Sequence, residues 1–188
     1  QTPVDGETPD YHRLAEVGDR GVLCLLSDST HADRPGYTPS ERVVGDNLSR
    51  VFYRAKGRII VTTFASNVPR IQQVIDAAYE YGRKVCVIGR SMENVVEVAM
   101  DMGFLKVPLG TLIDVRDIRN YPQSKIVVLS TGSQGEPLSA LSRISVGEHR
   151  HIKIIEGDLV VMAASHVPGN ETTVSRVVDN PFRQGAEV

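Results

Sequence analysis

The 188-residue sequence has no tryptophan, and aromatic residues make up only 5% of it. This argues against a single-strand-binding platform built on stacked aromatic side chains. Neither sign of charge dominates, since 23 Asp and Glu stand against 21 Lys and Arg, for a formal net charge of −2. The balance excludes a uniformly basic nucleic-acid binder but not a local basic patch. The 41% hydrophobic content excludes a largely disordered chain.

Cysteines are also scarce, and long apolar runs are absent. The two cysteines, Cys24 and Cys86, lie inside short apolar runs, so we interpret them as reduced core residues of an intracellular, cytoplasmic protein. No apolar run approaches the length of a transmembrane helix, and no signal peptide is recognisable. The sequence starts without Met and stops at Val188, where a new strand is predicted to begin, so we expect a piece of a longer chain.

Several motifs that identify enzymes are missing. No Walker A sequence or G-x-G-x-x-G follows a predicted strand, and no G-x-S-x-G elbow occurs. His149 and His151 have the spacing of the first two ligands of H-x-H-x-D-H, but Lys153 and Ile154 stand where its Asp and His would follow. We therefore interpret these two histidines as a solvated pair beside a strand.

The sequence does contain short, continuous apolar runs separated by helical patterns. Such runs are typical of strands buried on both faces of a parallel sheet. They predict strands at 21–27, 58–63, 84–88, 125–130 and 158–163, with a short extra strand within 102–122. Apolar periodicity predicts helices at 39–54, 68–81, 91–102, 137–144 and 170–182. The expected fold is α/β, with three layers and a mainly parallel sheet of about five strands flanked by helices.

Two of these helices carry more detailed expectations. Ser91 is predicted to cap the third helix, and Val95, Val98 and Met102 to form its buried side. Pro137 is predicted to open the fourth, because Pro favours the first helical position.

Ligands bind open parallel sheets at the carboxyl ends of the strands, so the loops there form the candidate site. These loops are rich in small, hydroxylated or charged residues. In the loop 130–137 (STGSQGEP), two glycines would let the backbone approach a ligand, and the following helix would favour a phosphate. The alternative is a tight turn that only caps a helix. Asp28, after the first predicted strand, is likewise either a cap or a carboxylate facing a cleft.

Six stretches at these loops resemble the β-CASP domain of bacterial ribonuclease J, in the metallo-β-lactamase/β-CASP ribonuclease family. In chain order they are TPVDGETPDYHRLAEVG, LLSDSTHADRPGYTPSE, TTFASNVPRIQQVIDAA, GRSMENVVEVA, STGSQGEPLSALSRI and PGNETTVSRVVDN. The resemblance implies a Rossmann-like β-CASP domain at 21–188, with 1–20 leading in from an absent metallo-β-lactamase domain. It also implies a parent enzyme that hydrolyses RNA with two metals, in 5′→3′ exonucleolytic and endonucleolytic modes, in RNA processing and decay.

The resemblance also implies roles for individual residues. Asp28 matches the acidic residue of the first β-CASP motif, with a supporting role at the catalytic cleft. His166 stands where the family pattern has Ser. The residues expected to bind RNA or its phosphates are Ser29, Thr30, Phe64, Ser66, Asn67, Arg90, Ser91, Thr131, Gly132, Ser133, Gln134, Gly135, Glu136, His166 and Asn170.

No metal ligand or cofactor is expected within these 188 residues. The parent's divalent metal, zinc first and magnesium or manganese as alternatives, is expected outside them, so we expect no hydrolysis by this chain alone. The expected partners are single-stranded RNA, the metallo-β-lactamase domain of the same polypeptide and further copies of the parent, with no membrane. Arg90 and Arg143 are candidates for a narrow basic strip.

Two other functions fit the same residues. The loop STGSQGEP is similar to phosphate loops of sugar-isomerase domains, which would make the chain a phosphosugar-binding regulatory α/β module. A domain inserted purely for dimerisation is the second alternative, and an exposed apolar patch would favour it.

Overall fold

A computed structural model describes residues 8–29, 32–33, 35–37 and 40–188. The chain divides into two compact units, Gln1–Val44 and Gly45–Val188. In the first unit, α1 (Tyr11–Asp19) begins after Asp10, whose side chain accepts a 2.8 Å hydrogen bond from the backbone N–H of Arg13. None of the described residues of this unit is buried. Among the described helices, none has the length and apolar character needed to cross a membrane.

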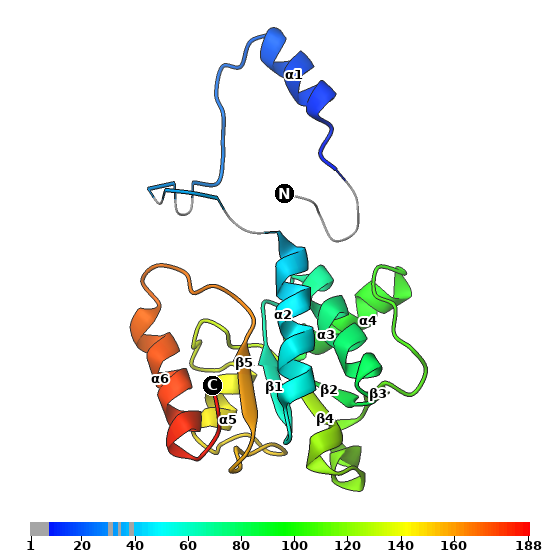
Figure 1. Ribbon diagram of the computed structural model, residues 1–188. Coiled ribbons are helices and arrows are strands. Elements are labelled where there is room, and N and C mark those ends of the chain that lie inside the picture. Colours follow the sequence, from blue (N-terminus) through cyan, green and yellow to red (C-terminus); the bar gives the residue numbers. More distant parts are fainter. Residues whose placement is uncertain (1–7, 30–31, 34, 38–39) are drawn as a thin grey trace. The chain divides into compact units, whose positions relative to one another are not determined.

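The second unit is built on a five-stranded, all-parallel sheet with the strand order β3-β2-β4-β1-β5 (Figure 1). Its strands are β1 (Ile59–Thr62), β2 (Lys84–Ile88), β3 (Leu112–Ile113), β4 (Ile126–Ser130) and β5 (Leu159–Met162). The helices are α2 (Glu41–Arg54), which starts in the first unit, α3 (Val68–Glu80), α4 (Arg90–Asp101), α5 (Ala140–Ser145) and α6 (Glu171–Arg183), with 3₁₀ turns η1 (Val115–Asn120) and η2 (Gln123–Lys125). The expected α/β fold with a parallel sheet is confirmed.

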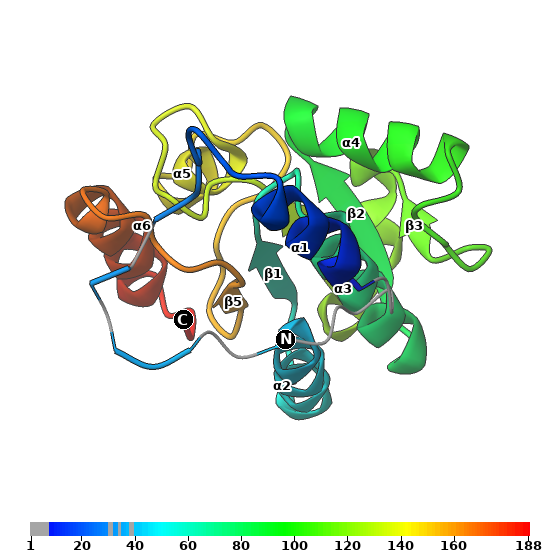
Figure 2. The same ribbon diagram turned by 90° about the horizontal axis from the view of Figure 1, so that it is seen from above.

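The two faces of the sheet are covered by different helices. α3 and α4 pack on each other and on β2, whereas α5 packs on α6. Buried side chains of α5, α6 and η1 share one core cluster with Ile60, Val128 and Val160, which are register partners in neighbouring strands. Both views show α3 and α4 toward β3, and α5 and α6 toward β5 (Figures 1 and 2). The chain continues from β1 toward β2 and from β4 toward β5, which are opposite directions across the sheet. The carboxyl end of the adjacent strands β1 and β4 is therefore the switch point, where α/β sheets bind ligands.

Four of the predicted strands are confirmed to within a residue or two at each end, and the short extra strand is β3. Their side chains explain why. Every residue of β1 and β4 is buried, as continuous apolar runs require of central parallel strands. The predicted α3 face of Ile71, Val74, Ile75 and Ala78 is also buried.

The strand predicted at 21–27 is wrong. These residues form no strand, and Leu23, Leu25 and Leu26 are almost fully exposed. A strand needs a hydrogen-bonded neighbour, and the described part of the first unit contains none to pair with it. The prediction that Cys24 lies in a core is wrong for the same reason, since the residue is exposed, whereas Cys86 is buried in β2 as expected.

The two cysteines are therefore expected to differ sharply in reactivity. Burial, helped by the carboxylates of Asp114 and Glu93, raises the pKa of the Cys86 thiol to about 12, while Cys24 is open to solvent. Since the thiolate is the reactive form, a disulfide reagent such as DTNB should modify one thiol in the native chain and the second only after denaturation. Rapid modification of two thiols in the native chain would contradict the burial of Cys86.

Two helix details also differ from expectation. α4 begins at Arg90, so Ser91 lies inside the helix and makes no cap, and the buried side consists of Met92, Val96 and Ala99 instead of Val95, Val98 and Met102. Both sets have helical spacing, and the sheet decides which of them is covered.

The fourth helix is shorter than predicted. α5 begins only at Ala140, after Ser139, whose Oγ accepts a 3.3 Å hydrogen bond from the Ser142 backbone N–H. Pro137 therefore lies in the loop before the helix. A helix of one and a half turns has little dipole to offer a phosphate, so the loop itself must supply most contacts to any anion.

A buried ion pair joins β1 to β5 at their amino ends. The Arg58 guanidinium donates to both carboxylate oxygens of Asp158, with a distance of 3.0 Å from Nε to Oδ1. It also donates to the carbonyl oxygen of Lys153, and Asp158 accepts from the backbone N–H of Ile155 at 3.0 Å. Both side chains are almost completely buried. The pair fixes the amino edge of the sheet, at the other end of the strands from the switch point.

Candidate functional site

A groove of about 1310 Å³ lies at the carboxyl edge of the sheet, at the switch point between β1 and β4. Three strand-to-helix connections line it, after β1, β2 and β4. The lining residues are Thr63, Phe64, Ala65, Gly89, Arg90, Ser91, Asn94, Thr131, Gly132, Glu136, Pro137, Leu138, Ser139, Ala140, Arg143 and His149. The set combines hydroxyl groups, two arginines and one exposed aromatic ring, which suits a ligand with both phosphates and flat apolar parts.

Glycines determine how closely the connections approach each other. Gly132 has a φ of +114°, and a Cβ there would lie 2.4 Å from Ser139 Oγ. At Gly89, with a φ of +99°, a Cβ would lie 3.1 Å from Thr131 Oγ1. Both glycines therefore let the loops pack closely on their own chain, and the prediction that the glycines of the loop 130–137 let the backbone approach a ligand stays a prediction.

Gln134 anchors the β4–α5 loop to the loop after β5. Only 6% of the residue is exposed, and its Nε2 donates to the carbonyl oxygen of Ser165 at 3.0 Å. Its Oε1 accepts from the backbone N–H of Val167 at 2.7 Å and from the Asn170 amide at 3.3 Å. The polar atoms of this side chain are thus used inside the protein, and Gln134 positions the loop from below the groove.

Gly135 holds the same loop against α6. The Thr173 hydroxyl donates to the carbonyl oxygen of Gln134 at 2.9 Å. A Cβ on Gly135 would lie 2.4 Å from both the carbonyl carbon and the carbonyl oxygen of Thr173. Only glycine fits this backbone approach, so the loop is fixed from two sides, by the Gln134 side chain and by the Gly135 contact.

Two cations in the groove have no countercharge in contact. Arg90 and Arg143, the first residue of α4 and a residue of α5, form no salt bridge with any described residue. The nearby carboxylate of Glu136 accepts a 3.2 Å hydrogen bond from the Gln134 backbone N–H. Cationic side chains without internal partners are available for phosphates, and they lie within one groove as the expected basic strip requires.

The structure assigns the expected RNA-binding residues to different places. Phe64, Arg90, Ser91, Thr131, Gly132 and Glu136 line the groove. Ser133, Gln134 and Gly135 are buried beneath it, and the Ser133 hydroxyl has no hydrogen-bond partner among the described residues. Asn170 also lies outside the lining, in contact with Gln134.

The loops after β1 and β5 hold three further expected residues, none of which lines the groove. Ser66 is exposed, and Asn67 caps α3 by accepting a 3.1 Å hydrogen bond from the Arg70 backbone N–H. His166 is exposed in the β5–α6 loop, where Glu171 accepts hydrogen bonds from the Gly169 backbone N–H. A hydrogen bond from the backbone N–H of Glu171 itself, followed by the bonds from Gly169 and the nearby charge of His166, lowers the pKa of the Glu171 carboxyl.

The remaining expected residues belong to the other compact unit. Asp28 and Ser29 are exposed there, and Thr30 lies outside the described residues. The groove lies within Gly45–Val188 and does not include Asp28, so the role of Asp28 at the catalytic cleft stays a prediction.

Within the described ranges, no three His, Cys, Asp or Glu side chains are grouped so that they could hold a metal ion. The described residues on their own therefore do not fit the metal centre that the resemblance implies for the parent enzyme, and we derive no catalytic step through such a metal here.

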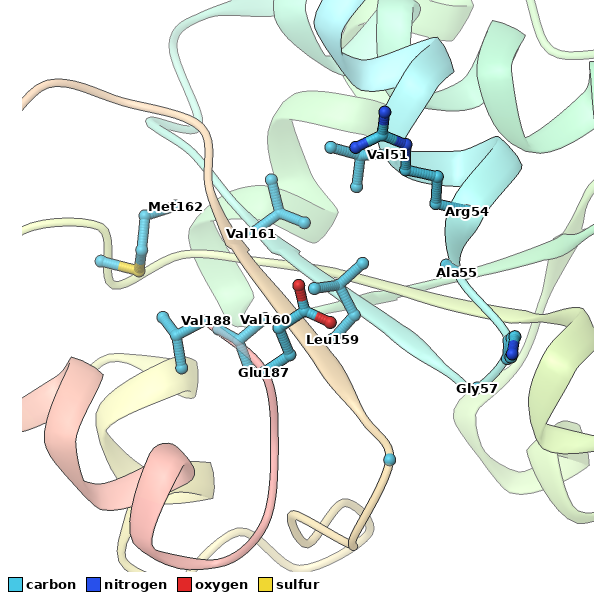
Figure 3. A pocket seen from close by; sticks show the side chains of 12 residues that line it. Val51, Arg54, Ala55, Gly57, Leu159, Val160, Val161, Met162, Glu187 and Val188 are labelled. Atoms are coloured by element: carbon cyan, nitrogen blue, oxygen red, sulfur yellow. The ribbon is translucent and has the colours of Figure 1, made fainter.

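A second hollow, of about 720 Å³, lies at the β5 edge of the sheet. Figure 3 shows Val51 and Arg54 of α2 above β5, with Glu187 and Val188 running beside the strand. The backbone N–H of Val160 donates to the carbonyl oxygen of Glu187 at 2.8 Å, so these last residues extend the sheet. The lining is largely aliphatic side chains and backbone, without the hydroxyl-rich loops of the groove, and we assign it no ligand.

One of the groove residues that sequence reasoning did not select is His149, which the sequence predicts to be one of a solvated pair. The only sequence feature that pointed to His149 was its spacing from His151, which resembles part of a metal-binding motif. Asn94, Leu138 and Ser139 were missed as well, because α4 and the start of α5 reach the groove only through the packing of their helices.

Comparison with known proteins agrees with this geometry. A family model described as "Ribonuclease J, beta-CASP domain" matches residues 56–180, which include every strand and every residue that lines the groove. Neither alternative function gains support from this match.

Curated relatives align along the whole chain. It is 50% identical over 187 residues to "Ribonuclease J" of Synechocystis sp., and it covers 29% of that protein. It is 44% identical over 188 residues to "Ribonuclease J2" of Bacillus subtilis, with 34% of that protein covered, and 43% identical to "Ribonuclease J" of Helicobacter pylori, with 27% covered. In each case all of this chain is aligned, so it spans about a third or less of the relatives it matches.

Proposed function

The chain belongs to the β-CASP domain family of ribonuclease J, and from this premise we propose that Gly45–Val188 holds single-stranded RNA in the groove for a larger ribonuclease. One observation carries the proposal. Arg90 and Arg143 come from different helices, line the same groove and have no salt-bridge partner among the described residues. A single strand presents phosphates on one side and bases on the other, and the exposed ring of Phe64 lies in the same groove.

The loop residues fall into three groups in this proposal, according to where they lie relative to the groove. Phe64, Ser91, Thr131, Gly132 and Glu136 form the wall that RNA meets. Ser133, Gln134, Gly135 and Asn170 hold that wall in place from below. Ser66, Asn67 and His166 stand on neighbouring loops, where RNA leaving the groove would pass.

The chemistry of the whole protein is a further part of the proposal. The relatives are named ribonucleases, and we assign to the parent the hydrolysis of RNA phosphodiesters in the cytoplasm. Because the described residues contain no group of metal ligands, we assign the two-metal centre of that reaction to another part of the parent. Asp28 would support that centre, and Ser29 and Thr30 would bind RNA or its phosphates. This chain alone would bind RNA without cleaving it, and its partners would be the rest of the polypeptide and further copies of the parent.

The experiment is to measure binding of a short fluorescein-labelled oligouridylate to the chain by fluorescence anisotropy at several salt concentrations. Replacement of Arg90 or Arg143 by Ala should weaken binding roughly ten- to hundredfold, as expected for a lost charged hydrogen bond. Each replacement should also make the slope of log affinity against log salt shallower by about 0.7 per lost phosphate contact.

Arg183→Ala is the matched control. Arg183 lies in the last turn of α6 and outside the groove, so its loss should leave both affinity and slope unchanged. Equal effects of all three replacements would mean that binding follows net charge and not the groove. A chain that binds no oligouridylate at low salt would overturn the proposal for these residues. Competition by glucose 6-phosphate would favour the phosphosugar alternative.

A further inference from the structure

His149 occupies a defined place in the wall of the groove. It lies just after α5, and its backbone N–H donates to the carbonyl oxygen of Arg143 at 3.1 Å. The residue lines the groove together with Arg143. The residue is partly buried, and hydrogen bonds to its Nδ1 hold the ring in the turn.

One ring nitrogen of His149 is already occupied. Nδ1 accepts hydrogen bonds from the backbone N–H groups of Ile152 at 3.1 Å and of His151 at 3.3 Å. A nitrogen that accepts two N–H bonds carries no proton, so the neutral ring must carry its proton on Nε2. Burial, followed by the nearby charges of Arg143 and His151, lowers the pKa of His149, which favours this neutral form.

The other nitrogen is available. Within the described part of the chain, no residue is hydrogen-bonded to Nε2 of His149. The tautomer makes Nε2 a donor only, so it complements an acceptor and not another donor. Because Arg143 lines the same groove, the acceptor that fits both groups is an anionic oxygen.

We propose that His149 contacts the RNA phosphate backbone, donating its Nε2–H to a non-bridging phosphate oxygen beside the phosphate that Arg143 binds. The inference rests on the proposed function and deepens it, because it assigns a neutral, directional donor to the phosphate backbone beside the cation Arg143. A neutral donor adds affinity without releasing a counterion, so its contribution should not depend on salt.

Two substitutions separate this role from a purely structural one. In His149→Asn, the side-chain oxygen can still accept from the backbone of the turn, but no donor reaches the position of Nε2. In His149→Gln, the longer amide places a donor near the position of Nε2 but loses the acceptor at Nδ1. The control is His151→Gln, which keeps the backbone N–H that binds His149 and changes a side chain outside the groove.

The test uses the full chain, the same oligouridylate and a pH of about 8, above the ordinary range of histidine. We expect His149→Asn to keep the melting temperature and to weaken binding about five- to tenfold, with an unchanged salt slope. His149→Gln should lower the melting temperature but bind within about twofold of the unchanged chain when assayed well below that temperature. His151→Gln should change neither property.

Other outcomes overturn the inference in distinguishable ways. If His149→Asn binds as tightly as the unchanged chain while Arg143→Ala binds weakly, His149 has only a structural role and the groove proposal stands. A shallower salt slope in His149→Asn would show that the ring acts as a cation, which contradicts the neutral donor. If neither arginine replacement weakens binding, the proposed function itself fails and the role of His149 fails with it.

Discussion

Replacement of Asp158 by Asn is expected to lower the free energy of unfolding by about 3–5 kcal/mol, the usual effect of removing one partner from a buried ion pair. Asn is close to Asp in size, so the loss would not come from a cavity. It would come from the Arg58 guanidinium, which stays buried without its countercharge. The measurement is chemical denaturation followed by circular dichroism, with the midpoint and the slope of the transition compared.

The matched control is Asp114→Asn. Asp114 also forms a bidentate pair, with Arg116 and two distances of 2.8 Å, but both side chains lie on the surface. An exposed pair contributes little, so this variant should unfold close to the unchanged chain. If the two variants lose similar free energy of unfolding, burial is not the reason why the Arg58–Asp158 pair stabilises the fold. Folded Asp158→Asn should still bind oligouridylate, because the pair lies at the opposite ends of the strands from the groove.

Replacement of Gly135 by Ala should have the second large effect. The residue has a φ of +70°, which costs an L-amino acid about 1–2 kcal/mol. The new Cβ would also meet the backbone of Thr173 at 2.4 Å, where no flexible side chain can move aside, and overpacking of this kind adds about 1–3 kcal/mol. We expect a total loss of roughly 2–5 kcal/mol, together with weaker RNA binding because the loop is pushed away from α6.

Gly147→Ala isolates the conformational part of this effect. Gly147 has a similar φ of +76°, but no atom lies within 4 Å of a Cβ built there. Its replacement should lose only the smaller conformational share and keep RNA binding. Equal losses in the two variants would show that the contact between Gly135 and Thr173 does not hold the loop.

The sequence reveals strands well where the tertiary structure buries both faces. The runs that became β1, β2 and β4 are short, continuous and apolar, and they lie inside the sheet, whereas the similar run of β5 lies at its end and is only partly buried. The run at 21–27 has the same composition and forms no strand. Composition shows that a segment is able to be an inner strand, but pairing needs a neighbour that only the assembled fold provides.

In the candidate site, too, the sequence predicted some features and the assembled fold determined the others. The rule that ligands meet the carboxyl ends of parallel strands predicted the right edge of the sheet, and Phe64, Arg90 and Thr131 do line the groove. The roles within the loop 130–137 were not accessible, because a polar residue in a polar loop gives no sign of which way it points. Gln134 points inward to the β5–α6 loop, and this depends on contacts more than thirty residues away in the chain.

By itself, the sequence determined the α/β class, the parallel strands of the second unit and the family, because these follow from local patterns and from motifs that stay in order along the chain. Only the tertiary structure decided the strand order, the side of α4 that is buried, and the meeting of Arg90, Arg143 and His149 in one groove. The physical reason is that these features arise from contacts between segments far apart in sequence. Such contacts are selected by packing of the whole domain and not by the preferences of any one segment.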